Sequence, residues 1–197
     1  KMHLTSDEVN VIEILPGGVV TKKAAAHIQL DENGEFVRNL KEDLVKVAVV
    51  ERHQGTGNVA CGFLKGYGIK EGAVALSVAH DSHNIIVVGV NDEEMEFAVN
   101  SLIAQEGGIV LVKEGKVIEQ MPMPIAGLMS DQSGEWVDEK LTSIHEKAYT
   151  ELGICGDVEP VMTLCFMSLA VIPEIKLTDM GLFDVTTFSF IPVEISR

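Results

Sequence analysis

The clearest strand pattern in the chain is Ile85-Ile86-Val87-Val88-Gly89-Val90, which is followed at once by Asn91-Asp92-Glu93-Glu94. A continuous β-branched run of this length indicates a strand that is buried on both faces. Asn91 or Asp92 can cap a helix, and the acidic residues suit the positive end of its dipole. Apolar residues then recur on one helical face, at Met95, Ala98, Val99, Leu102 and Ile103. Gly107-Gly108 supplies the positive φ that ends helices, so the sequence predicts a strand leading directly into a helix.

Hairpin patterns on both sides of this unit argue against a doubly wound sheet. Glu114-Gly115 separates two apolar strands at residues 109–112 and 117–121, and residues 44–50 predict a further buried strand. Helical spacing predicts two more helices over residues 133–152 and 160–170. The expected fold class is α+β, with mixed, mostly antiparallel sheets and two or three helices, preceded by short accessory strands. We expect an accessory β-strand segment at residues 1–42 and an α+β domain at residues 43–197.

Composition excludes several classes of protein. Of the 197 residues, 46% are hydrophobic, which is too many for a disordered chain. Asp and Glu outnumber Lys and Arg by 30 to 15, so we expect no nucleic-acid partner. No apolar run reaches the ~20 residues of a membrane helix, and the acidic N-terminus is unlike a signal peptide. With three scattered cysteines, the chain is expected to be cytoplasmic, without a membrane partner. Its start at Lys1-Met2, close to a predicted strand, is typical of a piece of a longer protein.

A short polar run between two apolar segments is the first candidate site. It gathers two imidazoles, a carboxylate, a hydroxyl and an amide in His80, Asp81, Ser82, His83 and Asn84. Strand ends are where mixed folds tend to place functional groups. The HExxH motif of zinc-binding helices is missing, and side chains of these types also bond their own backbone in structural loops. The residues alone leave both interpretations open, a metal-binding loop and a structural one.

A glycine-rich loop after the strand at residues 44–50 is the second candidate. Gly55-Thr56-Gly57 can turn backbone N–H groups toward an anion. The loop lacks the GK[ST] ending of a P-loop, and no GxGxxG pattern occurs in the chain. The residues therefore suggest an anion-binding loop without identifying its ligand.

Several ordered segments carry a family resemblance. They are Val11-Ile12-Glu13-Ile14-Leu15-Pro16-Gly17-Gly18-Val19-Val20-Thr21, Val50-Glu51-Arg52-His53 with Gly55-Thr56-Gly57, Gly62-Phe63-Leu64-Lys65-Gly66-Tyr67-Gly68-Ile69-Lys70-Glu71-Gly72-Ala73, Ala79-His80-Asp81-Ser82-His83-Asn84-Ile85-Ile86-Val87-Val88-Gly89 with Asn91-Asp92, and Pro122-Met123-Pro124-Ile125-Ala126-Gly127-Leu128-Met129-Ser130. Together they resemble the C-terminal region of bacterial-type adenine deaminase, of the amidohydrolase superfamily. The resemblance covers almost the whole chain and is more specific than any single short motif.

The resemblance implies a parent enzyme that hydrolyses adenine to hypoxanthine and ammonia. It also implies a divalent metal, manganese, iron or zinc, in a preceding (β/α)₈ barrel whose metal centre begins with an HxH pair. This sequence contains no HxH, so no metal ligand and no certain catalytic residue transfers to it, and no cofactor is expected in the fragment. The implied partners are that N-terminal barrel, adenine as the parent's substrate, and further copies in a homo-oligomer. Alone, the 197 residues are expected to be inactive.

A barrel leaves its active-site face open unless something covers it, and this region is a candidate cover. We expect active-site-facing positions, or contacts with the groups around the metal ligands, for His80, Asp81, Ser82, His83 and Asn84. Substrate-binding candidates are Glu51, Arg52, His53, Gly55, Thr56 and Gly57. The alternatives are a non-catalytic purine- or metabolite-binding module, and a structural oligomerisation domain whose loops shape it or fasten it to the barrel.

Overall fold

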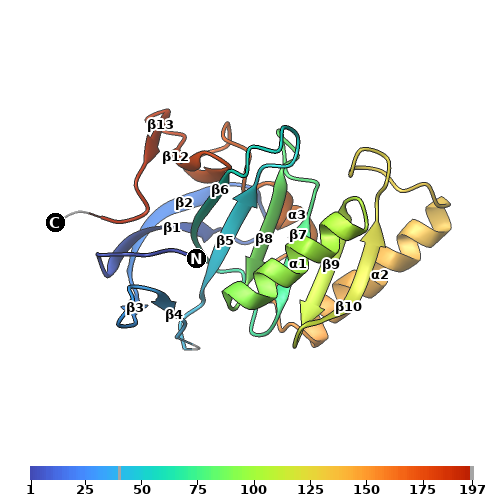
Figure 1. Ribbon diagram of the computed structural model, residues 1–197, viewed down its shortest axis with the longest axis horizontal. Coiled ribbons are helices and arrows are strands. Elements are labelled where there is room, and N and C mark those ends of the chain that lie inside the picture. Colours follow the sequence, from blue (N-terminus) through green and yellow to red (C-terminus); the bar gives the residue numbers. More distant parts are fainter. Residues whose placement is uncertain (40, 196–197) are drawn as a thin grey trace.

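An eight-stranded sheet forms the centre of the molecule in this computed structural model, which describes residues 1–39 and 41–195 (Figure 1). The strand order is β10-β9-β7-β8-β5-β6-β1-β2. These strands are β1 (Glu8–Ile14), β2 (Thr21–His27), β5 (Leu44–Val50), β6 (Val59–Lys65), β7 (Ala73–Leu76), β8 (Ile85–Gly89), β9 (Gly108–Lys113) and β10 (Lys116–Pro122). The apolar sequences of β5, β7 and β8 match their central, buried positions.

Neighbouring strands of this sheet are antiparallel, except that β1 and β6 run parallel with Ile12 opposite Leu64. Two smaller antiparallel sheets consist of β3 (Gln29–Leu30) with β4 (Phe36–Val37), and of β11 (Ile175–Thr178), β12 (Gly181–Asp184) and β13 (Ser189–Ile191). The predicted α+β class with mostly antiparallel sheets is confirmed. β1 and β2, from the predicted accessory segment, extend the main sheet, and the division at residues 42 and 43 stays a prediction.

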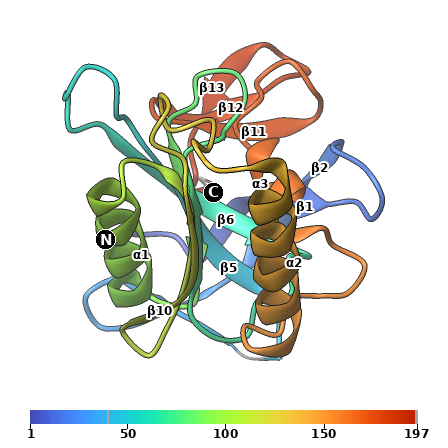
Figure 2. The same ribbon diagram turned by 90° about the vertical axis from the view of Figure 1, so that its right-hand side faces the viewer.

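Helices cover both faces of the main sheet (Figure 2). α1 (Asp92–Ala104) lies on one face, and α2 (Gly134–Thr150) and α3 (Pro160–Cys165) lie on the other. The core beneath α1 includes Ala98 and Leu102, and the larger core beneath α2 and α3 includes Tyr67 and Ile144. No helix in the described part of the chain is long and apolar enough to span a membrane.

The ends of α1 and α2 follow the capping signals in the sequence. The Asn91 Oδ1 accepts a hydrogen bond from the Glu94 backbone N–H at 2.7 Å. At the other end of α1 the first residue with positive φ is Glu106 (φ 66), one position before the predicted glycine, and the Gly107 N–H donates to the carbonyl of Leu102. Ser133 caps α2 in the same way, and α2 ends at Thr150 rather than at residue 152. Both predicted helices are confirmed.

The predicted third helix is wrong beyond Cys165. The sequence is apolar to residue 170, but α3 ends at Cys165 and a series of turns follows. The reason lies in the carbonyl groups that a longer helix would need. The carbonyl of Cys165 accepts the N–H of His80 at 2.9 Å, and the carbonyl of Met167 accepts the N–H of Leu177 at 3.0 Å. These two carbonyls would accept the N–H groups of Leu169 and Val171 in a longer helix, and distant segments occupy them instead.

Candidate functional site

Three loops meet at one end of the main sheet. The antiparallel pairing of Val50 with Ile85 places the loop after β5 beside the loop before β8. The loop between β10 and α2 joins them through a bond from Arg52 to Ala126. We call these segments, residues 51–58, 77–84 and 123–132, the loop cluster. Three of the ordered segments that carry the family resemblance therefore come together in space.

Arg52 is the side chain that ties the three loops together. Its Nε–H donates to the carbonyl of His83 at 2.6 Å, and its guanidinium donates to the carbonyl of Ala126 at 2.9 Å. A Cβ added at Gly127 would lie 3.0 Å from the guanidinium nitrogens, so glycine there lets the backbone approach the arginine closely. None of the ion pairs within residues 1–39 and 41–195 involves Arg52. Partial burial lowers the pKa of Arg52, but a guanidinium stays protonated, so Arg52 places a fixed positive charge between the three loops.

His80 and His83 form a ring stack with Phe166. The His80 ring lies 4.8 Å from the Phe166 ring, centre to centre and nearly parallel, and His83 meets the other imidazole edge-on at 5.2 Å. Burial, together with the charges of His80 and Arg52, lowers the pKa of His83, so this imidazole is neutral at pH 7. Its Nδ1 is buried and has no hydrogen-bond partner among the described residues. Buried polar atoms in folded proteins usually have a hydrogen-bond partner, so this nitrogen can still accept or donate a bond to a ligand.

Glu51 organises the glycine-rich loop from within. Its carboxylate accepts the backbone N–H groups of three loop residues and the hydroxyl of Thr56. These bonds, with the Thr56 N–H as the largest contribution, lower the pKa of Glu51 to about 2. Gly55 and Gly57 have positive φ, and nothing lies within 4 Å of where their Cβ atoms would be. Two of the predicted substrate-binding residues, Glu51 and Thr56, thus bond to each other, while the two glycines stay open to solvent.

The remaining predicted residues divide between the surface and the interior. Asp81 and Ser82 are exposed. His53 is also exposed, and its Nε2 bonds to the carbonyl of Ser82 at 2.7 Å, which joins the first two loops a second time. Asn84 is buried, and its Oδ1 accepts the backbone N–H of Arg52 at 3.3 Å. The structure therefore brings together both predicted polar segments, although only some of their side chains remain free to meet a ligand.

Ser77 is a residue of this site that sequence reasoning missed. It is buried, its hydroxyl donates to the carbonyl of Gly127 at 2.5 Å, and its oxygen accepts the N–H of Gly108 at 2.7 Å. This single side chain fastens the third loop to the start of β9. A lone serine at the end of an apolar run gives no signal of such a role. The third loop itself was detectable, because its segment is one of those that carry the resemblance.

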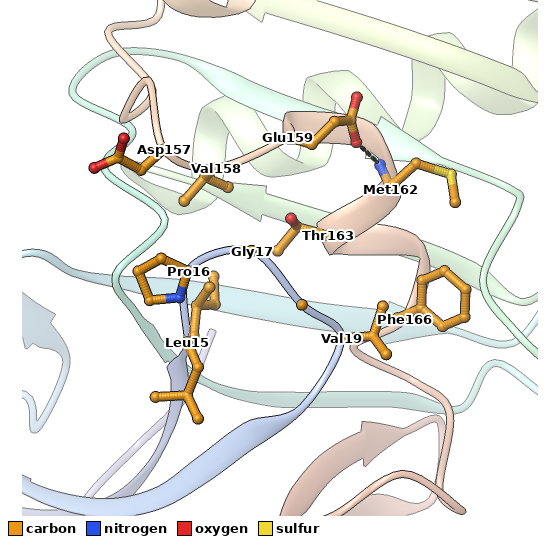
Figure 3. A pocket seen from close by; sticks show the side chains of 12 residues that line it. Leu15, Pro16, Gly17, Val19, Asp157, Val158, Glu159, Met162, Thr163 and Phe166 are labelled. Atoms are coloured by element: carbon orange, nitrogen blue, oxygen red, sulfur yellow. Dashed lines mark hydrogen bonds between the residues drawn. The ribbon is translucent and has the colours of Figure 1, made fainter.

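Two cavities flank the loop cluster. On the side of α1, Arg52, Ser77 and Glu106 contribute to the lining of a cavity of about 190 Å³. On the other side, Figure 3 shows Phe166 at the end of a pocket of about 300 Å³ between the turn that follows β1 and the start of α3. In that pocket Glu159 accepts the N–H of Met162. Phe166 thus forms a wall of this pocket and contacts His80 as well.

The donors present do not fit a divalent metal centre. Within residues 1–39 and 41–195, no group of three or more His, Cys, Asp or Glu side chains is arranged to hold a metal ion. His80 and His83 pack as an aromatic pair. What the loop cluster offers is a fixed cation, neutral imidazole and backbone groups at one rim, which suits hydrogen bonding to a polar ligand or to another protein surface.

Comparison with known proteins identifies the family. The family model of the adenine deaminase C-terminal domain matches residues 18–189. The chain is 68% identical over 194 residues to adenine deaminase 2 of Desulfotalea psychrophila, a match that covers 98% of this chain and 34% of that protein. It is 49% identical over 195 residues to adenine deaminase of Ligilactobacillus salivarius and 46% identical over 196 residues to that of Halalkalibacterium halodurans. These matches cover 99% of this chain, and 34% and 33% of the two relatives, so the chain spans about a third of the length of the curated relatives. The chain belongs to the adenine deaminase C-terminal domain family.

Proposed function

We propose that this chain is the C-terminal domain of an enzyme that hydrolyses adenine to hypoxanthine and ammonia, and that the loop cluster faces the purine site of the enzyme's N-terminal part. One observation carries the proposal. Three segments that resemble adenine deaminases converge on Arg52 and His83. Within residues 1–39 and 41–195, Arg52 forms no ion pair and the buried Nδ1 of His83 has no hydrogen-bond partner.

The reaction requires groups of the kinds that the loop cluster presents. Water adds to the purine carbon that carries the amino group, and ammonia leaves after that nitrogen gains a proton. The ring must be held by directed hydrogen bonds while bulk water is excluded. Arg52 supplies hydrogen-bond donors on a side chain that stays charged. A neutral His83 imidazole can accept a proton, which a charged imidazole cannot do. A divalent metal, which activates water in metal-dependent deaminases, would be held by the N-terminal part.

This proposal is tested by steady-state kinetics of a longer chain. That chain continues upstream of Lys1 to the length of the relatives. His80→Ala and His83→Ala should each lower kcat at least about tenfold, because a positioned acid–base or hydrogen-bonding group contributes about that much or more. His27→Ala is the matched control, since His27 is exposed at the end of β2, and it should leave kcat and KM unchanged. Melting temperatures separate loss of function from loss of fold. Unchanged kcat and KM in both loop variants would contradict the proposal.

The 197-residue chain alone should form no hypoxanthine from adenine in the presence of Mn²⁺ or Fe²⁺. Hypoxanthine production by this chain would overturn the assignment of the reaction centre to the N-terminal part. If the loop variants keep full turnover while the isolated chain binds adenine in calorimetry, a non-catalytic purine-binding module is favoured instead. The homo-oligomer stays a prediction, which sedimentation of the longer chain would test.

A further inference from the structure

The face of the sheet beneath α1 is only partly covered. α1 packs against β7, β8 and β9, whereas β5 and β6 extend beyond it. Side chains of β5 and β6 on this face, Val50, Val59 and Cys61, contribute to the apolar floor of a groove of about 370 Å³ beside α1. Val59 is 54% exposed although it lies within a strand of the central sheet. The opposite face of these strands is covered by the larger core.

The N-terminal residue lies in this groove. Lys1 lines the hollow beside α1, and it also lines a second hollow of about 330 Å³ that continues toward Val193. The two hollows share Lys1, Val59 and Cys61, so together they form one groove. Lys1 is held there by an ion pair of its Nζ with Glu35 at 3.1 Å. Both views place the N-terminus beside α1 (Figures 1 and 2).

Lys1 and Cys61 line both hollows of the groove. Burial raises the pKa of the Cys61 thiol, and the charge of the Lys1 α-amino group is close enough to oppose that rise. A residue joined to the amino group of Lys1 would therefore begin in the groove that Cys61 also lines. The rim toward α1 is acidic, because Glu93 and Glu96 lie along it. An apolar floor with an acidic rim suits an apolar segment that carries basic residues.

We propose that this groove, which we name the entry groove, holds the stretch that immediately precedes Lys1 in the longer chain. The proposal rests on the proposed function, in which this C-terminal domain makes up about a third of the enzyme's length and the N-terminal part precedes it. The groove ends at Val50 and Val59, which adjoin the first loop of the loop cluster. A segment that follows the groove from Lys1 therefore brings the N-terminal part beside that cluster. The entry groove is lined by Lys1, Ala48, Val50, Val59, Cys61 and Val99.

Alkylation of Cys61 tests the entry groove. The 197-residue chain and the longer chain, with Cys155 and any additional upstream cysteines replaced by serine, are treated with iodoacetamide, and modified Cys61 is quantified by peptide mass spectrometry. Cys165 gives little background, because burial raises its pKa to about 12. Cys61 should react at least about tenfold more slowly in the longer chain, because thiol modification follows the fraction of time that the groove is open. Equal rates in the two chains would overturn the proposal.

A pair of charge variants distinguishes occupation of the groove from general stabilisation. Val59→Glu in the longer chain should restore the Cys61 reaction rate of the 197-residue chain, because a carboxylate is unfavourable beneath an apolar segment. Met180→Glu is the matched control at a 73% exposed position in the β11–β12 turn, and it should leave Cys61 protected. Protection that persists in Val59→Glu would contradict the groove assignment. Adenine turnover, measured on the same samples, tests the proposed function separately: a longer chain that protects Cys61 without turnover supports the groove and contradicts that function.

Discussion

Replacing Lys176 by methionine should stabilise the 197-residue protein at pH 7 and lose that advantage at alkaline pH. Lys176 lies in β11 and is fully buried. Its ammonium donates to the carbonyl of Val19 at 2.8 Å, and no carboxylate in the described part of the chain forms an ion pair with it. Burial without a counter-charge lowers its pKa to about 8. Methionine has a similar length and no charge to bury.

The size of the effect follows from this pKa. A fall from 10.5 to about 8 corresponds to a penalty of about 3 kcal/mol for the charged form in the folded state. Below pH 8 both the folded and the unfolded chain bind the proton, so the whole penalty applies. Between pH 8 and 10.5 the unfolded chain binds it more strongly, so the wild-type protein gains stability from this group as pH rises. After allowance of about 1 kcal/mol for the lost bond to Val19, Lys176→Met should be about 2 kcal/mol more stable at pH 7 and about 1 kcal/mol less stable above pH 10.5.

Urea unfolding followed by circular dichroism at pH 7, 8.5, 9.5 and 10.5 measures the difference between the two chains. Tyrosines and cysteines also titrate in this range, but they are common to both chains and largely cancel in the difference. Lys116→Met, at an exposed position at the start of β10, should show no pH-dependent difference from the wild type. A stability difference for Lys176→Met that is the same at pH 7 and pH 10.5 would refute the assignment of an unpaired buried ammonium.

Other substitutions and conditions test the packing and the electrostatics. Gly72→Ala should lower the free energy of unfolding by at least about 2 kcal/mol, measured by urea titration, because its Cβ would lie 1.9 Å from the carbonyl oxygen of Val112 at a φ of +68°. Ser77→Ala should cost about 1–3 kcal/mol in the same assay, since it leaves the carbonyl of Gly127 without its buried donor. Partial burial raises the pKa of Glu119, but hydrogen bonds from Ser143, Lys140 and Lys147 of α2 outweigh it and lower this pKa to about 2. The stabilisation from Glu119 should therefore be lost as pH falls from 4.5 through 2, and the melting temperature of Glu119→Gln should depend less on pH in that window.

Local signals in the sequence were sufficient for most of the secondary structure. Asn91 or Asp92 was predicted to cap the first helix and residue 133 to begin the second, and Asn91 and Ser133 are the N-caps of α1 and α2. Such starts are visible in sequence because a capping side chain acts on backbone groups only three residues away. The strand order was not predictable, because the parallel pairing of β1 with β6 and the position of β7 between β8 and β9 depend on contacts far apart in the chain. The predicted end of α3 was wrong for the same reason, because the backbone N–H of His80, far away in the chain, bonds to the carbonyl of Cys165.

The candidate site, too, was predictable only where its signals are local in the sequence. The polar segments around Arg52 and His83 were found because their residue types are unusual between apolar strands. Their convergence depends on the pairing of β5 with β8, which no short pattern reveals. Ser77 and Phe166 could not be found, because a serine and a phenylalanine next to apolar segments look like ordinary core residues. The side chains that position a site are thus less visible in sequence than those that bear its charge.

The proposal that the loop cluster faces the purine site predicts the effect of Arg52→Gln on the longer chain, measured as the steady-state kcat/KM for adenine. If the loop cluster faces the purine site, loss of this fixed charge should lower kcat/KM at least about tenfold, as removal of a transition-state donor does, while the melting temperature shows that the fold is retained. A folded Arg52→Gln enzyme with the kcat/KM of the wild type would contradict the placement of the loop cluster at the purine site.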